Sequence, residues 1–240
     1  MAKISVAMAV YNGERYLKEQ IDSILCQLKP QDELVISYDL STDSTWAIIN
    51  DYRNRYPGQI KLYVNNMPGI IGNFENAISH CLGEYIFISD QDDMWLLNKR
   101  DKIVNSFQTN DADMIIHNGV HINEVGNQVS QSFFSMHRIG PGKIRNILKP
   151  RYSGCCMAFK TGMVSTLLPI PPSVGAYDHW IGTIGEYFGR IEYIEDVLLY
   201  HRLHDNNATP KSRRTLLRVT IVRINLLYHL FCRYKKCKTH

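Results

Sequence analysis

Short apolar runs alternate with amphipathic segments through residues 4–89, and this alternation limits the fold more than any other feature of the sequence. The apolar runs with the length of buried strands are 4–10, 34–37, 60–64 and 85–89. The segments between them that repeat apolar side chains at helical spacing are 14–28, 44–56 and 73–81. Strands that alternate with helices in this way predict an α/β fold, with a mostly parallel central sheet flanked by helices.

The regular alternation ends near residue 110. The elements expected beyond it are strands at 113–117, 155–160 and 191–200, a helix at 180–188, and polar irregular chain over 121–142. We therefore expect one catalytic-size domain over residues 1–210, with a nucleotide-type half at 1–110 and a mixed half at 111–210. Residues 211–240 would form a separate C-terminal segment.

The segment 211–240 is strongly basic, although the whole chain has a formal net charge of only +4. It holds nine of the 27 Lys and Arg residues and no Asp or Glu, which leaves 18 basic and 23 acidic side chains in residues 1–210. A body that binds nucleic acid should be basic over one face. Nucleic acid is therefore not expected as a partner.

The same segment predicts a basic amphipathic helix, because apolar side chains recur at helical spacing among its Lys and Arg residues. These side chains are Leu217, Ile221, Ile224, Tyr228 and Phe231. Such a helix suits an anionic membrane surface. The alternative is a helix that packs on the body or on a second subunit, with its basic face in solvent, so an oligomer stays open.

Cysteine usage and the lack of a long apolar stretch predict a cytoplasmic protein. The six cysteines form no C-x-x-C pattern and no zinc-finger spacing with histidine, which favours reduced thiols. No stretch approaches the roughly 18 uncharged apolar residues of a membrane span, and the run 4–10 is too short for a signal sequence. Together with the basic segment, this predicts a peripheral protein on the inner face of the cell membrane.

Polar clusters follow three of the apolar runs, at 11–13, 39–43 and 90–93. Ligands of open α/β sheets bind outside the carboxyl ends of the strands. Asp90, Asp92 and Asp93 repel one another, which predicts a divalent cation, Mg²⁺ or Mn²⁺, that also takes substrate phosphates. The alternative is a solvated acidic loop that caps the helix near Lys99. Because the sequence has no glycine-rich phosphate-binding loop, phosphate neutralisation is left to the metal and to scattered basic side chains.

Together, these motifs resemble the family 2 inverting glycosyltransferases, which have the GT-A fold. The matching motifs are, in chain order, Ile4–Val6 with Tyr11–Gly13, then Asp39–Asp43, Asp90–Asp93, Gly154–Cys155, Tyr177–Trp180 and Tyr200–His204. The resemblance covers residues 3–207. The segment 89–95, with Asn-Gly-Glu at 12–14, is similar to the bacterial branch that includes rhamnosyltransferases of cell-surface polysaccharide synthesis.

The resemblance implies a binding site for a nucleoside-diphosphate sugar in the half 1–110 and an acceptor site in 111–210. The donor-binding residues would be Ala9, Tyr11, Asp39, Asp90, Gln91 and Arg202. Tyr11 would stack on the nucleobase, Asp39 would accept a hydrogen bond from the base imide, and Asp90 would lie near the ribose. Arg202 would supply positive charge.

The resemblance also implies a metal ligand and a general base. Asp92 would bind the metal that bridges the diphosphate, and His204 would approach the diphosphate or the metal. Asp178 would take the proton from the acceptor hydroxyl, with the adjacent His179 as the competing candidate. The supporting residues would be Asp93, near the metal, and Trp95 and Trp180, beside the sugar pocket.

The implied activity is inverting transfer of a sugar from dTDP-rhamnose or a UDP-sugar to a hydroxyl of a polysaccharide or lipid-linked oligosaccharide. A hexosyl or N-acetylhexosaminyl donor is an alternative within this class. A sugar nucleotidyltransferase would need a glycine-rich loop with a basic residue after the run 4–10, which residues 11–14 do not supply. A nucleotide- or glycan-binding module without turnover is the other alternative, because Tyr38 and Leu40 replace the Asp and Gly that the family has beside Asp39.

Overall fold

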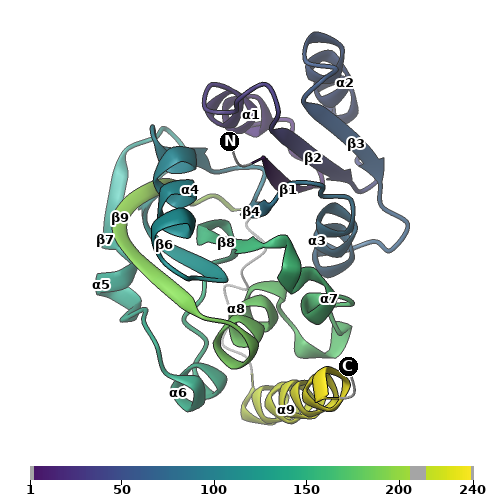
Figure 1. Cartoon of the computed structure of the whole chain (residues 1–240). Helices are drawn as coiled ribbons and strands as arrows, with labels where there is room; N and C mark the ends of the chain where they lie inside the picture. The colour runs from purple at the N-terminus through teal and green to yellow at the C-terminus, as the bar shows by residue number, and fades with distance from the viewer. Residues whose placement is uncertain (1–2, 206–214, 239–240) are drawn as a thin grey trace.

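The computed structural model describes residues 3–205 and 215–238, and the described chain is built around a single mixed sheet (Figure 1). Its nine strands include eight in the order β3-β2-β1-β4-β8-β6-β9-β5, and β7 pairs with β6. The strands are β1 (Ile4–Val10), β2 (Glu33–Tyr38), β3 (Ile60–Val64), β4 (Tyr85–Ser89), β5 (Met94–Trp95), β6 (Met114–Ile122), β7 (Gln128–Ser132), β8 (Met157–Lys160) and β9 (Ile191–Arg202).

Helices cover both faces of this sheet. Apolar side chains of α1 (Leu17–Leu25), α2 (Thr45–Arg55) and α4 (Lys99–Thr109) are buried on one face. Those of α3 (Ile70–Ser79), α8 (Tyr177–Phe188) and α9 (Leu216–Lys238) are buried on the other. The shorter helical elements are α5 (Phe133–His137), α6 (Lys143–Leu148), α7 (Val164–Leu167) and the 3-10 turns η1 (Gly154–Cys156), η2 (Thr161–Met163) and η3 (Pro172–Val174).

Strands β1–β4 run parallel, as the alternation in the sequence predicts. Farther along, β8 lies antiparallel between β4 and β6, β5 is antiparallel to β9, and β9 is parallel to β6. The sheet is therefore parallel in its first half and mixed overall. The carboxyl ends of β1, β2 and β4 meet at one edge, where ligands of open α/β sheets bind.

The second half is more regular than its sequence pattern predicts. Strand β6 continues past residue 117 to Ile122, since its distal part pairs with β9 and places Val120 opposite Tyr200. The segment 121–142, expected to be irregular, contains β7 and α5. The end of β6 is stabilised by β9, which is distant in sequence, and β7 by its pairing with β6, and apolar periodicity reveals neither partner.

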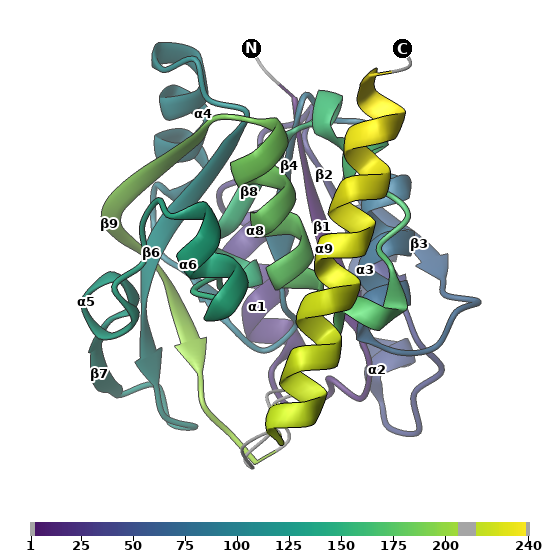
Figure 2. The same cartoon turned by 90° about the horizontal axis from the view of Figure 1, so that it is seen from below.

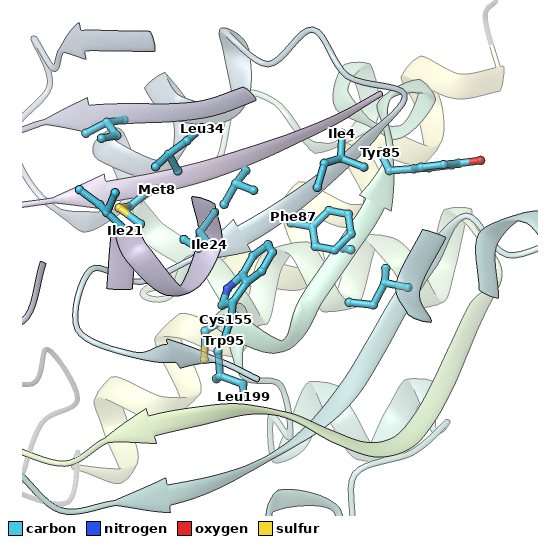
Figure 3. Close-up of a cluster of buried hydrophobic side chains, with 14 of the residues drawn as sticks. Ile4, Met8, Ile21, Ile24, Leu34, Tyr85, Phe87, Trp95, Cys155 and Leu199 are labelled. Atoms are coloured by element: carbon cyan, nitrogen blue, oxygen red, sulfur yellow. The ribbon is translucent and has the colours of Figure 1, made fainter. Parts of the chain in front are cut away.

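Alternating side chains of β1 separate the two cores. Ile4 and Met8 pack toward α1, where Figure 3 shows Met8 near Ile21 and Ile24, whereas Ala7 belongs to the core of the other face. Farther along the sheet, the ring centroids of Phe87 and Trp95 lie 5.5 Å apart. The loops at the carboxyl ends of the strands therefore rest on a close-packed core.

The predicted C-terminal helix is present as α9, but it packs through a different set of side chains. Val222, Leu226 and Leu230 are buried, and α9 lies across the face that carries α3 and α8 (Figure 2). The predicted apolar stripe instead faces outward: 50% to 72% of each side chain is exposed in Leu217, Ile221, Ile224, Tyr228 and Phe231. The basic residues Lys211, Arg213 and Arg214 lie outside the described residues. Within 3–205 and 215–238, no helix has the length and apolar character needed to cross a membrane.

Candidate active site

The loop after β1 is held to the loop after β4 by the side chain of Gln91. Tyr11 N donates a hydrogen bond to Gln91 Oε1 at 2.9 Å, and Gln91 Nε2 donates to Tyr11 O at 2.8 Å. A Cβ at position 13 would lie 2.5 Å from Gln91 Oε1, so a larger residue there would displace the Gln91 amide from these hydrogen bonds. Gln91, predicted as a donor-binding residue, therefore also positions the loop that carries Tyr11.

The same loop is held to the segment that follows β2. Asn12 has a φ of 47°, and its Oδ1 accepts a hydrogen bond from Thr42 N at 2.8 Å. Its backbone N donates to Ser41 Oγ at 3.0 Å, and Gly13 N donates to Thr45 Oγ1 at 2.7 Å. These bonds place the three polar clusters predicted from the sequence at one edge of the sheet.

A cleft of about 600 Å³ opens at this edge. It is lined by Tyr11, Asn12, Gly13, Arg15, Tyr16, Gln91, Asp92, Glu124, His204 and Asp205. Four residues predicted from the sequence are thus together in one cleft: Tyr11, Gln91, Asp92 and His204. The side chain of Tyr11 is 54% exposed, which leaves a ring face available for stacking.

Asp92 and His204 form a direct pair in this cleft. His204 Nε2 lies 2.8 Å from Asp92 Oδ2, and the His204 ring lies 5.1 Å from the ring of Tyr16. The two residues are 112 positions apart in the sequence, Asp92 in the loop after β4 and His204 in the chain after β9, and the fold brings them together.

Arg202 is buried behind this pair rather than in the cleft lining. Its guanidinium donates to Glu19 Oε2 at 2.5 Å and to Glu124 O at 3.0 Å, and its Nε donates to Asp92 O at 3.3 Å. The guanidinium also lies 4.8 Å from the centre of the Tyr16 ring. These contacts hold the backbone that carries Asp92.

Asp39 and Ala9 lie at the carboxyl ends of β2 and β1 but are not among the residues that line the cleft. Asp39 is buried, and its Oδ1 and Oδ2 accept hydrogen bonds from Asn65 Nδ2 at 2.6 Å and from Gly69 N at 2.9 Å. Ala9 is half-buried and pairs with Ser37. Asp39 therefore holds the chain after β3, whatever it contacts in a bound donor.

The carboxylates of Asp90 and Asp93 lie under the cleft together with the thiol of Cys155. One oxygen of each carboxylate and the sulfur all lie within 4.8 Å of one another. Burial raises the pKa of both carboxyl groups well above the ordinary value, and the charge of Asp92 raises both further. Asp93 and Lys99 are 1% exposed, so this is not the solvated capping loop that the sequence left open.

A divalent cation fits this group of residues. Asp93 Oδ2 is buried and has no hydrogen-bond partner among the described residues, and the neighbouring carboxylates repel one another. Carboxylate oxygens are the ligands that Mg²⁺ and Mn²⁺ prefer. A cation therefore agrees with the charge of this site, although the Cys155 thiol is not a ligand that Mg²⁺ prefers.

Asp178 lies in the first turn of α8, which begins three residues earlier than predicted. It is half-buried, and its Oδ1 accepts a hydrogen bond from His179 N at 2.7 Å. The preceding residue, Tyr177, donates to Asp90 Oδ1 at 3.2 Å. A Cβ at Gly154 would lie 2.2 Å from Tyr177 Oη, so a glycine is needed there. This contact brings the start of α8 to the acidic cluster.

His179, Trp180 and Trp95 are buried and do not line the cleft, in contrast to the roles expected for them. The His179 ring nitrogens face Asn146 O at 3.1 Å and the Arg223 guanidinium at 3.3 Å, toward α6 and α9. Trp180 Nε1 donates to Leu167 O at 2.8 Å within the core beneath α9. The Trp95 ring packs on Phe87 and lies 4.4 Å from Lys99 Nζ, below the acidic cluster.

Sequence patterns missed several residues of this region. Arg15 and Tyr16 line the cleft although their spacing assigned them to a helix, and Glu124 comes from the segment expected to be irregular. Lys99 is buried, its Nζ donates to Cys155 O at 3.0 Å, and burial lowers its pKa to about 8. Because lysine side chains are rarely buried, the sequence gives no sign that Lys99 lies beneath the site.

Solved structures described with bound nucleotide sugars share this fold. TarS 1-349 of S. aureus, in complex with UDP-GlcNAc, matches with a TM-score of 0.73 at 20% identity, over 95% of this chain and 66% of that one. The mannosyltransferase PcManGT of Pyrobaculum calidifontis, in complex with GDP-Man and Mn²⁺, matches with a TM-score of 0.59 at 21% identity, over 98% of this chain and 64% of that one. The fold is GT-A.

Sequence relatives point to the same group. Alr2836 of a Nostoc species, described as an uncharacterized glycosyltransferase, is 28% identical over 85% of this chain and 66% of its own length. The dTDP-rhamnosyl transferase RfbG of Shigella flexneri is 37% identical over 44% of this chain and 38% of its own length. The chain thus spans less than two thirds of these relatives. The family model described as Glycosyl transferase family 2 matches residues 5–168, so the chain belongs to glycosyl transferase family 2.

Proposed function

We propose that this chain transfers a sugar from a nucleoside-diphosphate donor to a hydroxyl of a polysaccharide or lipid-linked glycan, with inversion at the anomeric carbon. The observation that carries the proposal is the cleft in which Tyr11, Gln91, Asp92 and His204 lie together. An exposed aromatic ring and an Asp–His pair in one cleft suit the base and the diphosphate of a nucleoside diphosphate. Family membership supports the same reaction class.

Donor binding would use the cleft from the ring of Tyr11 to the Asp92–His204 pair. Tyr11 would stack on the base, and Asp39 would accept a hydrogen bond from the base imide through a lone pair that Asn65 and Gly69 do not use. Arg202 would hold the backbone of Asp92 in place, as its contacts indicate. UDP- and dTDP-linked sugars are the favoured donors, because TarS is described with UDP-GlcNAc and RfbG as a dTDP-rhamnosyl transferase.

A Mg²⁺ or Mn²⁺ ion would be held by Asp92 and His204, with the carboxylate of Asp90 nearby. When bound, such an ion supplies positive charge where the diphosphate leaves. The Mn²⁺ described with PcManGT supports this proposal. The chain itself excludes water beneath the site, since Asp93, Lys99 and Trp95 are buried there.

Asp178 would take the proton from the acceptor hydroxyl as the oxygen attacks. A carboxylate within hydrogen-bond reach is needed because a sugar hydroxyl is a weak nucleophile at neutral pH. Attack opposite the diphosphate inverts the anomeric carbon and needs one base and no covalent nucleophile. His179 is not assigned this role, because its ring faces α6 and α9.

Calorimetric titration of UDP, dTDP and GDP, each with Mn²⁺ and with EDTA, tests the donor site directly. We expect one nucleotide to bind more tightly than the others, and about 100-fold more tightly with the metal than in EDTA. Metal-dependent binding without donor consumption by any acceptor would instead favour the binding module. No binding in either condition would indicate that Tyr38 and Leu40 have disabled the site, and the proposal would fail.

Replacing Asp39 with Ala is expected to weaken UDP, dTDP and GDP alike, by about 10- to 100-fold, because a hydrogen bond to a charged group is lost. Calorimetry of the three nucleotides measures this change. The matched control is Asn65→Ala, which removes the internal hydrogen bond to Asp39 but keeps the carboxylate. Equal loss of affinity in the control would show that Asp39 acts only through the chain after β3.

The exposed stripe of α9 is proposed to bind an anionic membrane surface. Ile224 and Phe231 are 60% and 55% exposed, and residues 211–240 have no acidic side chain to repel anionic lipid. The double variant Ile224→Glu, Phe231→Glu is expected to lose co-sedimentation with vesicles of phosphatidylglycerol and phosphatidylcholine. Gln128→Glu with Gln131→Glu adds the same charge on β7 and should leave binding unchanged. Undiminished sedimentation of the α9 variant would refute this proposal.

A further inference from the structure

Cys155 is a buried thiol that the proposed transfer does not use. It lies in η1, directly before β8, and is 1% exposed. Figure 3 shows it in the same buried cluster as Trp95 and Leu199. Its sulfur lies within 4.8 Å of a carboxylate oxygen of both Asp90 and Asp93. The Cys155 thiol, directly before β8, thus lies beside both carboxylates of the acidic cluster.

The cluster has an unfilled acceptor. Asp93 Oδ1 accepts a hydrogen bond from Arg202 N at 3.2 Å, but Asp93 Oδ2 has no hydrogen-bond partner in the described part of the chain, although the residue is 1% exposed. A buried carboxylate oxygen without a partner is costly. A cation between the three groups would satisfy it.

The charges of the cluster also favour a cation. The carboxylates of Asp90 and Asp93 lie together with the Cys155 thiol, one ligand atom of each within 4.8 Å of the others. Lys99 supplies one positive charge nearby, and its Nζ donates to Cys155 O. One ammonium cannot balance both carboxylates, whereas an added divalent cation can.

We propose that Asp90, Asp93 and Cys155 form a second cation site, distinct from the Asp92–His204 pair, that takes a thiophilic divalent cation such as Zn²⁺. A thiolate with two carboxylates favours Zn²⁺ or Co²⁺ over Mg²⁺, which prefers oxygen alone. Ligand atoms around tetrahedral zinc lie about 3.3–3.8 Å apart, so the groups, which lie within 4.8 Å of one another, need to close by at most about 1.5 Å. On binding, the S–H bond breaks, the sulfur electron pair forms the S–Zn bond, and the proton leaves to solvent.

This site goes beyond the proposed transfer and does not depend on it. One consequence does rest on that function: a bound zinc ion would hold Asp90, which the proposal gives to the donor, so zinc and donor should compete. The test of the site itself therefore reads out metal binding rather than turnover.

Cobalt binding to the metal-free full chain is the experiment. The exposed thiols of Cys26, Cys232 and Cys237 are first replaced by Ser, so that the remaining cysteines are buried. We expect Co²⁺ to produce a sulfur-to-cobalt charge-transfer absorption, Zn²⁺ to abolish it by displacement, and Mg²⁺ to leave it unchanged. About one proton should be released for each ion bound.

Variants of the proposed ligand residues test which side chains bind the cobalt ion. Cys155→Ser should lose the absorption, whereas the matched control Cys81→Ser, also a buried thiol, should keep it. Asp93→Asn keeps the thiol and should weaken Co²⁺ by roughly tenfold or more. Circular dichroism establishes that each variant is folded. A parent protein without the absorption, or the same absorption in Cys155→Ser, would overturn the assignment.

Discussion

Replacing Asp178 with Asn is expected to lower the rate of sugar transfer by about 10²- to 10⁴-fold while donor affinity stays within a small factor of the parent. The amide cannot take a proton from the acceptor hydroxyl. Its Oδ1 can still accept the hydrogen bond that Asp178 Oδ1 accepts from His179 N, so the start of α8 should keep its geometry. Single-turnover transfer to an acceptor glycan gives the rate, and calorimetry gives the donor affinity.

The matched control for this prediction is Asp51→Asn, which makes the same change on the exposed surface of α2. It should leave both transfer and donor affinity unchanged. A second variant, Asp178→Glu, tests position rather than charge, because the carboxylate is kept but displaced by one methylene. If Asp178→Asn reduced donor affinity as much as transfer, Asp178 would be a structural residue and the base would have to be sought elsewhere.

Replacing Asp92 with Ala is expected to remove the metal dependence of donor binding. The carboxylate that pairs with His204 Nε2 at 2.8 Å would be lost, and with it a metal ligand in the cleft. We expect affinity for the nucleotide to fall by about 100-fold in Mn²⁺. Affinity in EDTA should change little, so the two conditions would become nearly equal. Calorimetry with and without Mn²⁺ measures both values.

Two further variants interpret the Asp92 result. His204→Ala removes the other member of the pair and should have the same kind of effect, smaller if His204 contacts only the diphosphate. Asp196→Ala removes a surface carboxylate that pairs with Lys102 and should change nothing. Metal dependence that survives in Asp92→Ala would assign the donor-side cation to Asp90 and Asp93 instead.

The strands of the first half could be predicted because most of their residues are apolar and contiguous in the sequence. Strands β1, β3 and β4 match the apolar runs at 4–10, 60–64 and 85–89. Strands β1 and β4 are covered by helices on both faces, so nearly all of each run is apolar, whereas β3 lies at the edge of the sheet and is only partly buried. Strand β7 has no such run: it is largely exposed and ordered through its pairing with β6, which depends on residues outside its own sequence.

The sequence predicted the residues of the candidate site that follow the ends of strands. It did not predict those whose contacts depend on the direction in which a helical side chain points. Tyr11, Gln91 and Asp92 follow parallel strands, so their meeting at one edge follows from the topology. In α8, successive side chains are rotated by about 100°. Tyr177 therefore reaches Asp90, while His179, two residues farther on, faces α6 and α9. The order of residues in the motif does not show in which direction each side chain points.

The hydrogen bonds that hold residues 11–14 also have an energetic consequence for ligand binding. Fixing the backbone of one residue costs about 1–2 kcal/mol in conformational entropy. In this protein the fold has already ordered the loop, through Gln91 on one side and the segment 41–45 on the other. A loop of four residues that became ordered only with the ligand would subtract roughly 4–8 kcal/mol from the binding free energy. A rigid loop after β1 leaves that free energy available for affinity.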